Sequence, residues 1–273
     1  MRVHFSALGC RLNEAEVERL SRTAVALGHE VVADVSQADW ALINTCTVTH
    51  VAARKSRQAI RRLHQRAPEV RIAVLGCYGT MTPEVALSLP GVAMVIPNAE
   101  KERALRLIAE ASDASGSATA AAVSAHPPVR RTRAFVKIQD GCDNHCTYCV
   151  VRIARGPARS RPYPEVLAEI SQRITEGARE VVLTGVNIGS YGRDLVGHEA
   201  AGTVTLATMV ARLLEETTIP RLRLSSLEPW DVDERLLALF ADPRLCPQAV
   251  LSGKSSNREI WFFPSHSTLT MKK

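Results

Sequence analysis

Short apolar runs alternate with amphipathic segments along the first 111 residues of the chain. Residues 3–8 predict a strand, and residues 14–27 predict a helix that places Val17, Leu20, Ala24 and Leu27 on one face before Gly28. Further strands are expected at 29–35, 40–44, 72–75 and 92–96, and further helices at 51–65, 82–89 and 100–111. Strands that alternate with helices imply an α/β fold with a doubly wound parallel sheet.

A second series of strands and helices begins near residue 133. Before it, residues 112–129 are rich in Ser, Ala and Gly, end at Pro127-Pro128 and show no apolar period, so they predict a linker. Strands are expected at 133–138, 180–184 and 221–226, and helices at 164–177, 206–217 and 232–242. Repeated strand–helix units with ligands at the strand ends resemble a partial barrel. The expected domains are therefore 1–111 and 130–246, followed by a tail at 247–273.

The composition fits a globular protein that handles metal. Hydrophobic residues make up 46% and charged residues 23% of 273 residues. No segment approaches the roughly 20 apolar residues that a membrane-spanning helix needs. His4 and Ser6 interrupt the apolar run that an export signal would require at the start, so a cytoplasmic protein is expected. In such a chain seven cysteines favour metal binding over disulfides.

The net charge of +6 is concentrated in two places. One expected helix carries Arg54, Lys55, Arg57, Arg61, Arg62 and Arg66 without an acidic residue. Around residue 145 a second cluster consists of Arg130, Arg131, Arg133, Lys137, Arg152, Arg155, Arg159 and Arg161. Each cluster alone is compatible with a solvated surface. Together they favour RNA as a partner.

Cys142, Cys146 and Cys149 form a C-x3-C-x2-C motif directly after an expected strand and a Gln-Asp-Gly turn. Thiolate is the usual ligand of a four-iron, four-sulfur cluster, and three cysteines leave one iron open for a substrate. A zinc site would need a fourth ligand such as His145, which adjoins Cys146. A redox pair of thiols would leave Cys142 unexplained. The motif therefore favours an iron–sulfur cluster.

Three other cysteines follow three separate expected strands. Cys10, Cys46 and Cys77 come just after the strands that end near residues 8, 44 and 75, and two of them are preceded by glycine. Ligands of open α/β sheets bind beyond the carboxyl ends of the strands, so these thiols are expected to converge on a second cluster. The alternative is that each is an ordinary buried cysteine. Cys246 is interpreted as an incidental thiol.

The combined motifs resemble a known family. The segments Gly-Cys10-Arg-Leu-Asn-Glu-Ala-Glu, Asn-Thr-Cys46-Thr-Val, Leu-Gly-Cys77, the C-x3-C-x2-C motif, Ala-Arg-Gly-Pro-Ala-Arg-Ser-Arg161 and Leu-Thr-Gly-Val-Asn-Ile-Gly-Ser-Tyr191 are similar to those of the radical S-adenosylmethionine (SAM) methylthiotransferases. The start of the chain most resembles the branch that acts on threonylcarbamoyladenosine beside the tRNA anticodon. The resemblance covers residues 1 to about 245.

The resemblance implies two four-iron clusters and SAM as cofactors. Cys142, Cys146 and Cys149 would hold the cluster that binds SAM, and Cys10, Cys46 and Cys77 an auxiliary cluster that carries or donates sulfur. The implied partners are the tRNA anticodon stem-loop and an electron donor such as flavodoxin or ferredoxin, without a membrane. Further SAM contacts are expected from Tyr148, Arg159, Thr184, Gly185 and Glu228. Arg161 is a further candidate for the SAM carboxylate or an RNA phosphate.

After Cys246 the sequence departs from the family pattern. Residues 247–273 have no helical or strand period long enough for the further strand–helix units of that pattern, and Trp261-Phe262-Phe263 stands out in a chain with 4% aromatic residues. A frameshifted or recombined end with an incomplete barrel is the interpretation that this pattern favours. Two alternatives to an active enzyme follow: a remnant that binds clusters or RNA without turnover, and a zinc-stabilised RNA-binding module.

Overall fold

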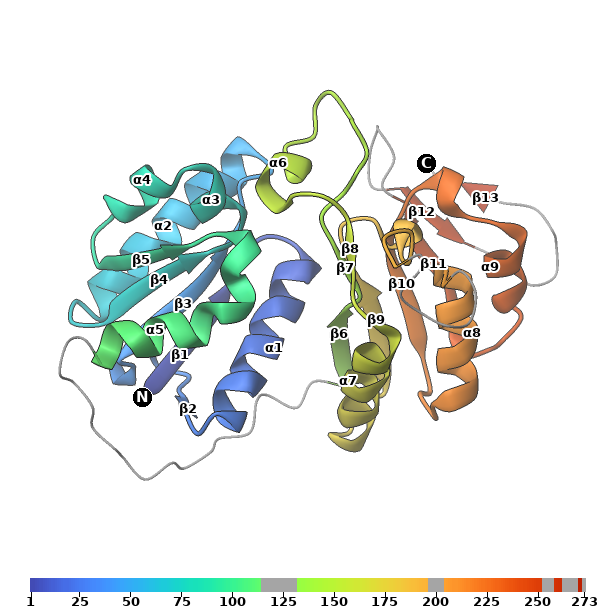
Figure 1. Cartoon of the computed structure of the whole chain (residues 1–273), viewed down its shortest axis with the longest axis horizontal. Coiled ribbons are helices and arrows are strands. Elements are labelled where there is room, and N and C mark those ends of the chain that lie inside the picture. Colours follow the sequence, from blue (N-terminus) through green and yellow to red (C-terminus); the bar gives the residue numbers. More distant parts are fainter. Residues whose placement is uncertain (114–131, 196–203, 252–257, 262–269, 272–273) are drawn as a thin grey trace. The chain divides into compact units, whose positions relative to one another are not determined.

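The computed structural model describes residues 1–113, 132–195, 204–251, 258–261 and 270–271, which form two compact units (Figure 1). The first unit consists of Met1–Val129 and Asn144–Gly156, and the second of Arg130–Asp143 and Pro157–Lys273. The segment Asn144–Gly156, expected in the second domain, thus groups with the first. The expected linker lies outside the described residues, except for residues 112–113, which continue a helix.

The first unit contains a parallel five-stranded sheet in the order β2-β1-β3-β4-β5. The strands are β1 (Arg2–Ala7), β2 (Glu30–Val31), β3 (Trp40–Thr45), β4 (Arg71–Leu75) and β5 (Val92–Ile96). Ala7 lies opposite Asn44, and Asn44 opposite Leu75, so three strands end at the same level. The strand expected at 29–35 is shorter because the Asp34 carboxylate accepts a hydrogen bond from the Ser36 backbone N–H and starts a 3-10 turn, η1 (Val35–Gln37).

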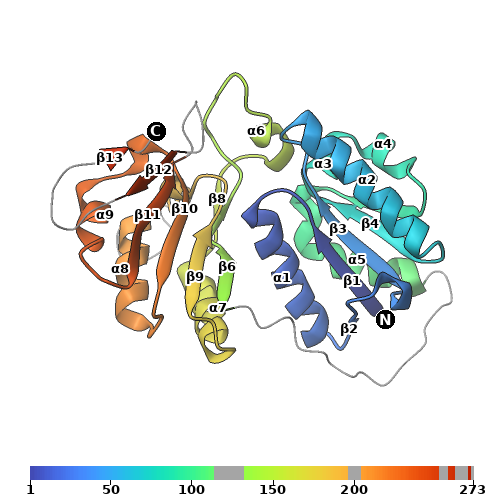
Figure 2. The ribbon, with the colours of Figure 1, turned by 180° about the vertical axis from the view of Figure 1, so that it is seen from behind.

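Helices cover both faces of this sheet (Figures 1 and 2). On one face α1 (Arg11–Ala26) and α5 (Ala104–Asp113), which follows the 3-10 turn η2 (Asn98–Arg103), bury Leu20 and Ile108. On the other, α2 (His50–Arg66), α3 (Gly76–Met81) and α4 (Pro83–Leu87) bury Ile60 and Tyr78. The doubly wound sheet predicted from the sequence is therefore present.

The second unit is a six-stranded sheet in the order β13-β12-β11-β10-β9-β6. Its parallel part comprises β6 (Arg133–Lys137), β9 (Glu180–Thr184), β10 (Leu222–Leu227) and β11 (Leu245–Leu251). The helices α7 (Tyr163–Thr175), α8 (Leu206–Glu216) and α9 (Glu234–Leu239) share one apolar core with these strands. Short elements follow the strands: η3 (Ile188–Ser190), η4 (Pro229–Asp231) and the paired β7 (Gln139–Asp140) and β8 (Arg159–Ser160).

The tail forms more structure than the sequence predicts. β11 continues to Leu251, and β12 (Arg258–Trp261) and β13 (Thr270–Met271) add antiparallel strands to it. An open sheet edge offers main-chain hydrogen bonds to a segment whatever its side-chain period. Within the ranges described above, we find no helix of the length and apolarity that a membrane span requires.

Candidate cluster-binding sites

The structure brings Cys10, Cys46 and Cys77 to one edge of the first sheet. Cys10 directly precedes α1, Cys46 directly follows β3, and Cys77 lies in the first turn of α3, directly after β4. Burial raises the pKa of the Cys46 thiol, and the nearby Cys10 and Cys77 thiols raise it further. The three sulfur groups are therefore close enough to interact electrostatically. Cys10 is exposed, whereas Cys46 and Cys77 are buried.

Gly9 makes this convergence possible. It has a φ angle of +104°, and a Cβ atom built on it would lie 2.5 Å from Cys46 Cβ and 2.9 Å from Cys46 Sγ. A larger residue would therefore both strain the backbone and displace the sulfur of Cys46. The sequence signal for this close approach is the Gly-Cys pair at residues 9–10.

Polar side chains around the three thiols were missed in the sequence analysis. Asn13 Oδ1 lies 3.8 Å from Cys10 Sγ, and Asn98 Nδ2 lies 3.8 Å from Cys77 Sγ. The Ser56 hydroxyl accepts a hydrogen bond from the Cys46 backbone N–H (3.2 Å) and donates one to the Cys46 carbonyl (2.8 Å). Such outer contacts orient metal ligands. Only Asn13 had a signal in the sequence, since it lies within the Gly-Cys-Arg-Leu-Asn segment.

A buried ion network lies on the same side of the sheet. Glu16 accepts hydrogen bonds from Lys101 Nζ (2.7 Å) and Arg155 Nη1 (3.0 Å), and all three side chains are at most 4% exposed. Asn44 Nδ2 donates to the same carboxylate at 2.9 Å. The three ionic groups together carry one positive charge. Three thiols beside a net positive, buried network are a donor set that suits an anionic iron–sulfur cluster.

No group of three or more His, Cys, Asp or Glu side chains in the described ranges is arranged to hold a single metal ion. A four-iron cluster is bound through separate iron corners, so its ligands are spaced differently from those of one ion. The assignment of the six cysteines as ligands remains a prediction from their chemistry and positions.

The C-x3-C-x2-C segment is divided between the two units. Cys142 follows Gly141 in the second unit, whereas Cys146 and Cys149 belong to Asn144–Gly156 in the first. Cys142 and Cys146 are half-buried and Cys149 is exposed. The Cys149 backbone N–H donates to the Cys146 carbonyl (3.1 Å), which closes a turn between them. Tyr148, expected near the SAM adenine, is 67% exposed.

Thr184 and Gly185 lie at the carboxyl end of β9 and are buried. The buried Gln139 side chain joins the loop after them to the loop before Cys142. Its Oε1 accepts from the backbone N–H groups of Val186 and Asn187 (both 3.0 Å), and its Nε2 donates to the Gly141 carbonyl (2.7 Å). A Cβ on Gly185 would lie 2.9 Å from Gln139 Oε1. Gln139, which sequence analysis treated only as part of a turn, thus fixes two loops.

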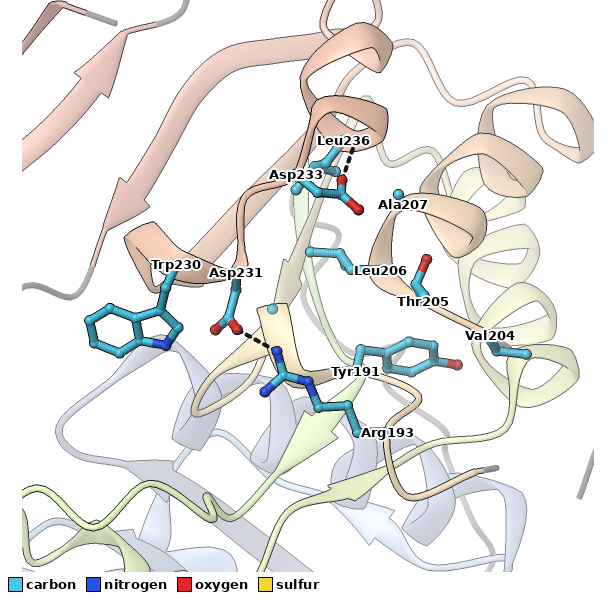
Figure 3. A pocket seen from close by; sticks show the side chains of 11 residues that line it. Tyr191, Arg193, Val204, Thr205, Leu206, Ala207, Trp230, Asp231, Asp233 and Leu236 are labelled. Carbon is cyan, nitrogen blue, oxygen red and sulfur yellow. Dashed lines mark hydrogen bonds and ion pairs between the residues drawn. The ribbon is translucent and has the colours of Figure 1, made fainter. Parts of the chain in front are cut away.

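A pocket of about 220 Å³ lies beyond β9 and β10 in the second unit (Figure 3). Arg193 donates to Asp231 (2.6 Å), whose side chain also accepts from Asn187 Nδ2 (2.9 Å), and Trp230 is 63% exposed beside them. The predicted SAM contacts do not line this pocket: Glu228 is half-buried just before η4, and Arg159 is exposed in β8.

Four of the six described residues of the second basic cluster are paired with acidic groups. The pairs are Arg133–Glu180 (2.7 Å), Lys137–Asp140 (3.1 Å), Arg155–Glu16 (3.0 Å) and Arg161–Glu169 (2.7 Å). Arg161 also donates to the Lys137 carbonyl. Glu180 and Glu16 lie 47 and 139 residues from their basic partners, so a local charge run could not reveal these two pairs. Arg130 and Arg131 lie outside the described residues.

The chain is similar to known proteins in its first third and in its fold. Residues 2–97 match the model described as "Uncharacterized protein family UPF0004". The radical S-adenosylmethionine methyltransferase TsrM from Kitasatospora setae has a similar fold: its structure with tryptophan and a SAM analogue gives a TM-score of 0.62 at 14% identity, over 92% of this chain and 58% of that one. Its structure with cobalamin and a [4Fe-4S] cluster gives 0.60 at 13% identity, over 92% and 60%. The chain thus shares its α/β fold with these two structures.

The chain is also similar to curated tRNA methylthiotransferases. Threonylcarbamoyladenosine tRNA methylthiotransferase MtaB from Chlamydia pneumoniae is 34% identical over 93% of this chain and 58% of its own length. The MtaB protein of Aquifex aeolicus is 32% identical over 95% and 64%, and the tRNA-2-methylthio-N(6)-dimethylallyladenosine synthase of Maricaulis maris is 32% identical over 95% and 61%. The chain is thus similar to tRNA methylthiotransferases over nearly its whole length. It spans about three fifths of the length of these relatives.

Proposed function

We propose that this chain carries the two cluster sites of a tRNA methylthiotransferase that modifies threonylcarbamoyladenosine beside the anticodon. The observation that carries the proposal is the convergence of Cys10, Cys46 and Cys77 at one sheet edge, in a chain that also contains the C-x3-C-x2-C motif. The names of the curated relatives support tRNA methylthiolation. The nucleoside is the finer part of the proposal and follows the MtaB relatives.

Each trio of cysteines would hold one four-iron cluster. When bound, the clusters and SAM supply one-electron bond cleavage, sulfur and a methyl group. The chain's own residues bind and orient these groups: Gly9 admits the Cys46 sulfur, Ser56 fixes the Cys46 backbone, and Gln139 fixes the loops beside Cys142 and Gly185. Tyr148, Arg159, Thr184, Gly185 and Glu228 remain the proposed SAM contacts. A flavodoxin or ferredoxin is the proposed electron donor.

The proposed nucleoside is tested by incubating the protein with two modified tRNAs. Reconstituted protein, dithionite and SAM are incubated with tRNA that carries either threonylcarbamoyladenosine or dimethylallyladenosine. Nucleosides from digested tRNA are then analysed by mass spectrometry. We expect a methylthio product from the first tRNA. Product from the second tRNA alone would overturn the proposed nucleoside, whereas SAM cleavage without product from either would favour a remnant without turnover.

Helix α2 supports RNA as the partner. The helix carries five arginines and one lysine and no acidic residue, and Arg57 lies over the Tyr78 ring, 5.9 Å from its centroid. Arg54, Lys55, Arg61, Arg62 and Arg66 are exposed. Cys10, Cys46 and Cys77 are called the strand-end trio below. α2 begins four residues after Cys46, so a nucleic acid bound along this helix would lie near the thiols of the strand-end trio.

Neutralising α2 should weaken RNA binding. We expect Arg54→Gln/Arg61→Gln/Arg62→Gln to lower tRNA affinity and to reduce the slope of log K against log salt by about 2, since each lost phosphate contact contributes roughly 0.7–0.9. Filter binding at several salt concentrations measures both. Arg106→Gln on α5, an exposed residue paired with Glu110, is the matched control. An unchanged salt slope in the triple variant would exclude α2 as the RNA-binding surface.

A further inference from the structure

The short helix α6 (Val151–Arg155) begins two residues after Cys149, and its last two residues contact the surroundings of the strand-end thiols. The Ala154 carbonyl accepts a hydrogen bond from Asn98 Nδ2 at 2.7 Å. Arg155 Nη2 donates to Asn13 Oδ1 at 2.6 Å, and Arg155 Nη1 donates to Glu16 at 3.0 Å. Both Ala154 and Arg155 are buried, so these contacts are shielded from water.

The same two asparagines also contact sulfur. Asn13 lies between Arg155 and Cys10, and Asn98 lies between Ala154 and Cys77. Cys10 and Cys77 are thus each linked to α6 through one asparagine side chain.

We propose that Arg155 is a positioning residue that couples the two cysteine trios: binding of a cluster by Cys10, Cys46 and Cys77 orders the segment that carries Cys146 and Cys149. A cluster that fixes the sulfur atoms of Cys10 and Cys77 restricts Asn13 and Asn98, which in turn hold α6. Linkage makes the effect reciprocal, so an ordered α6 also favours cluster binding by the strand-end trio. This inference rests on the proposed function, because it requires a cluster at that trio.

Hydrogen exchange tests the coupling without relying on activity. In a Cys142→Ala/Cys146→Ala/Cys149→Ala background, residues 144–156 carry no cluster of their own. We expect reconstitution with iron and sulfide to slow amide exchange in this segment by about tenfold, because a fixed anchor raises the free energy of local opening. Adding Arg155→Met should abolish the slowing. Arg152→Met, at an exposed position of the same helix, should preserve it.

A second variant separates positioning from folding. Asn98→Ala removes the bond to the Ala154 carbonyl but leaves the buried charges in place, and it should lose part of the slowing. Iron is measured in the same samples. If the Arg155→Met protein binds about four irons and still shows the full slowing, the coupling is overturned while the proposed function stands. If the background with Arg155 intact binds no iron, both are overturned.

Discussion

Replacement of Cys142, Cys146 and Cys149 by alanine is expected to reduce the cleavage of SAM to the level of a protein-free blank. The reason is that these thiolates are the proposed ligands of the cluster whose open iron binds SAM. The measurement is 5′-deoxyadenosine formed by reconstituted protein in dithionite. The roles of the two trios predict a different result for Cys10→Ala/Cys46→Ala/Cys77→Ala, which should still cleave SAM but form no methylthio product.

Cys246→Ala is the control for this experiment. Cys246 is buried at the start of β11, away in sequence from both motifs, and its replacement should leave cleavage unchanged. Cleavage by the Cys142/Cys146/Cys149 variant at the rate of the unchanged protein would show that the motif does not bind the reacting cluster.

Glu16→Ala is expected to destabilise the metal-free first unit by about 3–5 kcal/mol, because it leaves two buried cations without their shared carboxylate. Lys101 and Arg155 both donate to Glu16, and each is at most 4% exposed. Urea unfolding of the full chain measures the change. Adding Lys101→Met should recover part of the loss, since only one uncompensated cation then remains.

Glu110→Ala provides the matched control for Glu16→Ala. Glu110 pairs with Arg106 on the surface of α5, where both side chains are about 60% exposed, and an exposed pair contributes about 0–1 kcal/mol. A Glu16 variant no less stable than the Glu110 variant would mean that the buried network contributes little to the fold and is a poor anchor for α6.

Local periodicity predicted most of the fold. The strands at 92–96 and 180–184 have the expected bounds, and β1, β3 and β4 lie within two residues of theirs. The short helices α3 and α6 were not predicted, because five or six residues are too few to show a helical periodicity of apolar positions. Their formation depends on tertiary contacts, such as the Asn98 bond to Ala154.

Residues of the candidate sites could be predicted from the sequence only where the residue type itself indicates the chemistry, as cysteine indicates metal binding. Cysteine positions after strands predicted the trio at residues 10, 46 and 77. Glu16 and Arg155 lie 139 residues apart, and no local pattern identifies them as partners.

The most direct test of two separate cluster sites is the iron content of anaerobically reconstituted variants. We predict about eight irons per chain for the unchanged protein, about four for each of the two triple alanine variants, and none for the variant that lacks all six cysteines. Bound zinc without visible absorption would support the zinc module. Folded, unchanged protein that remains colourless and iron-free after reconstitution would contradict the account.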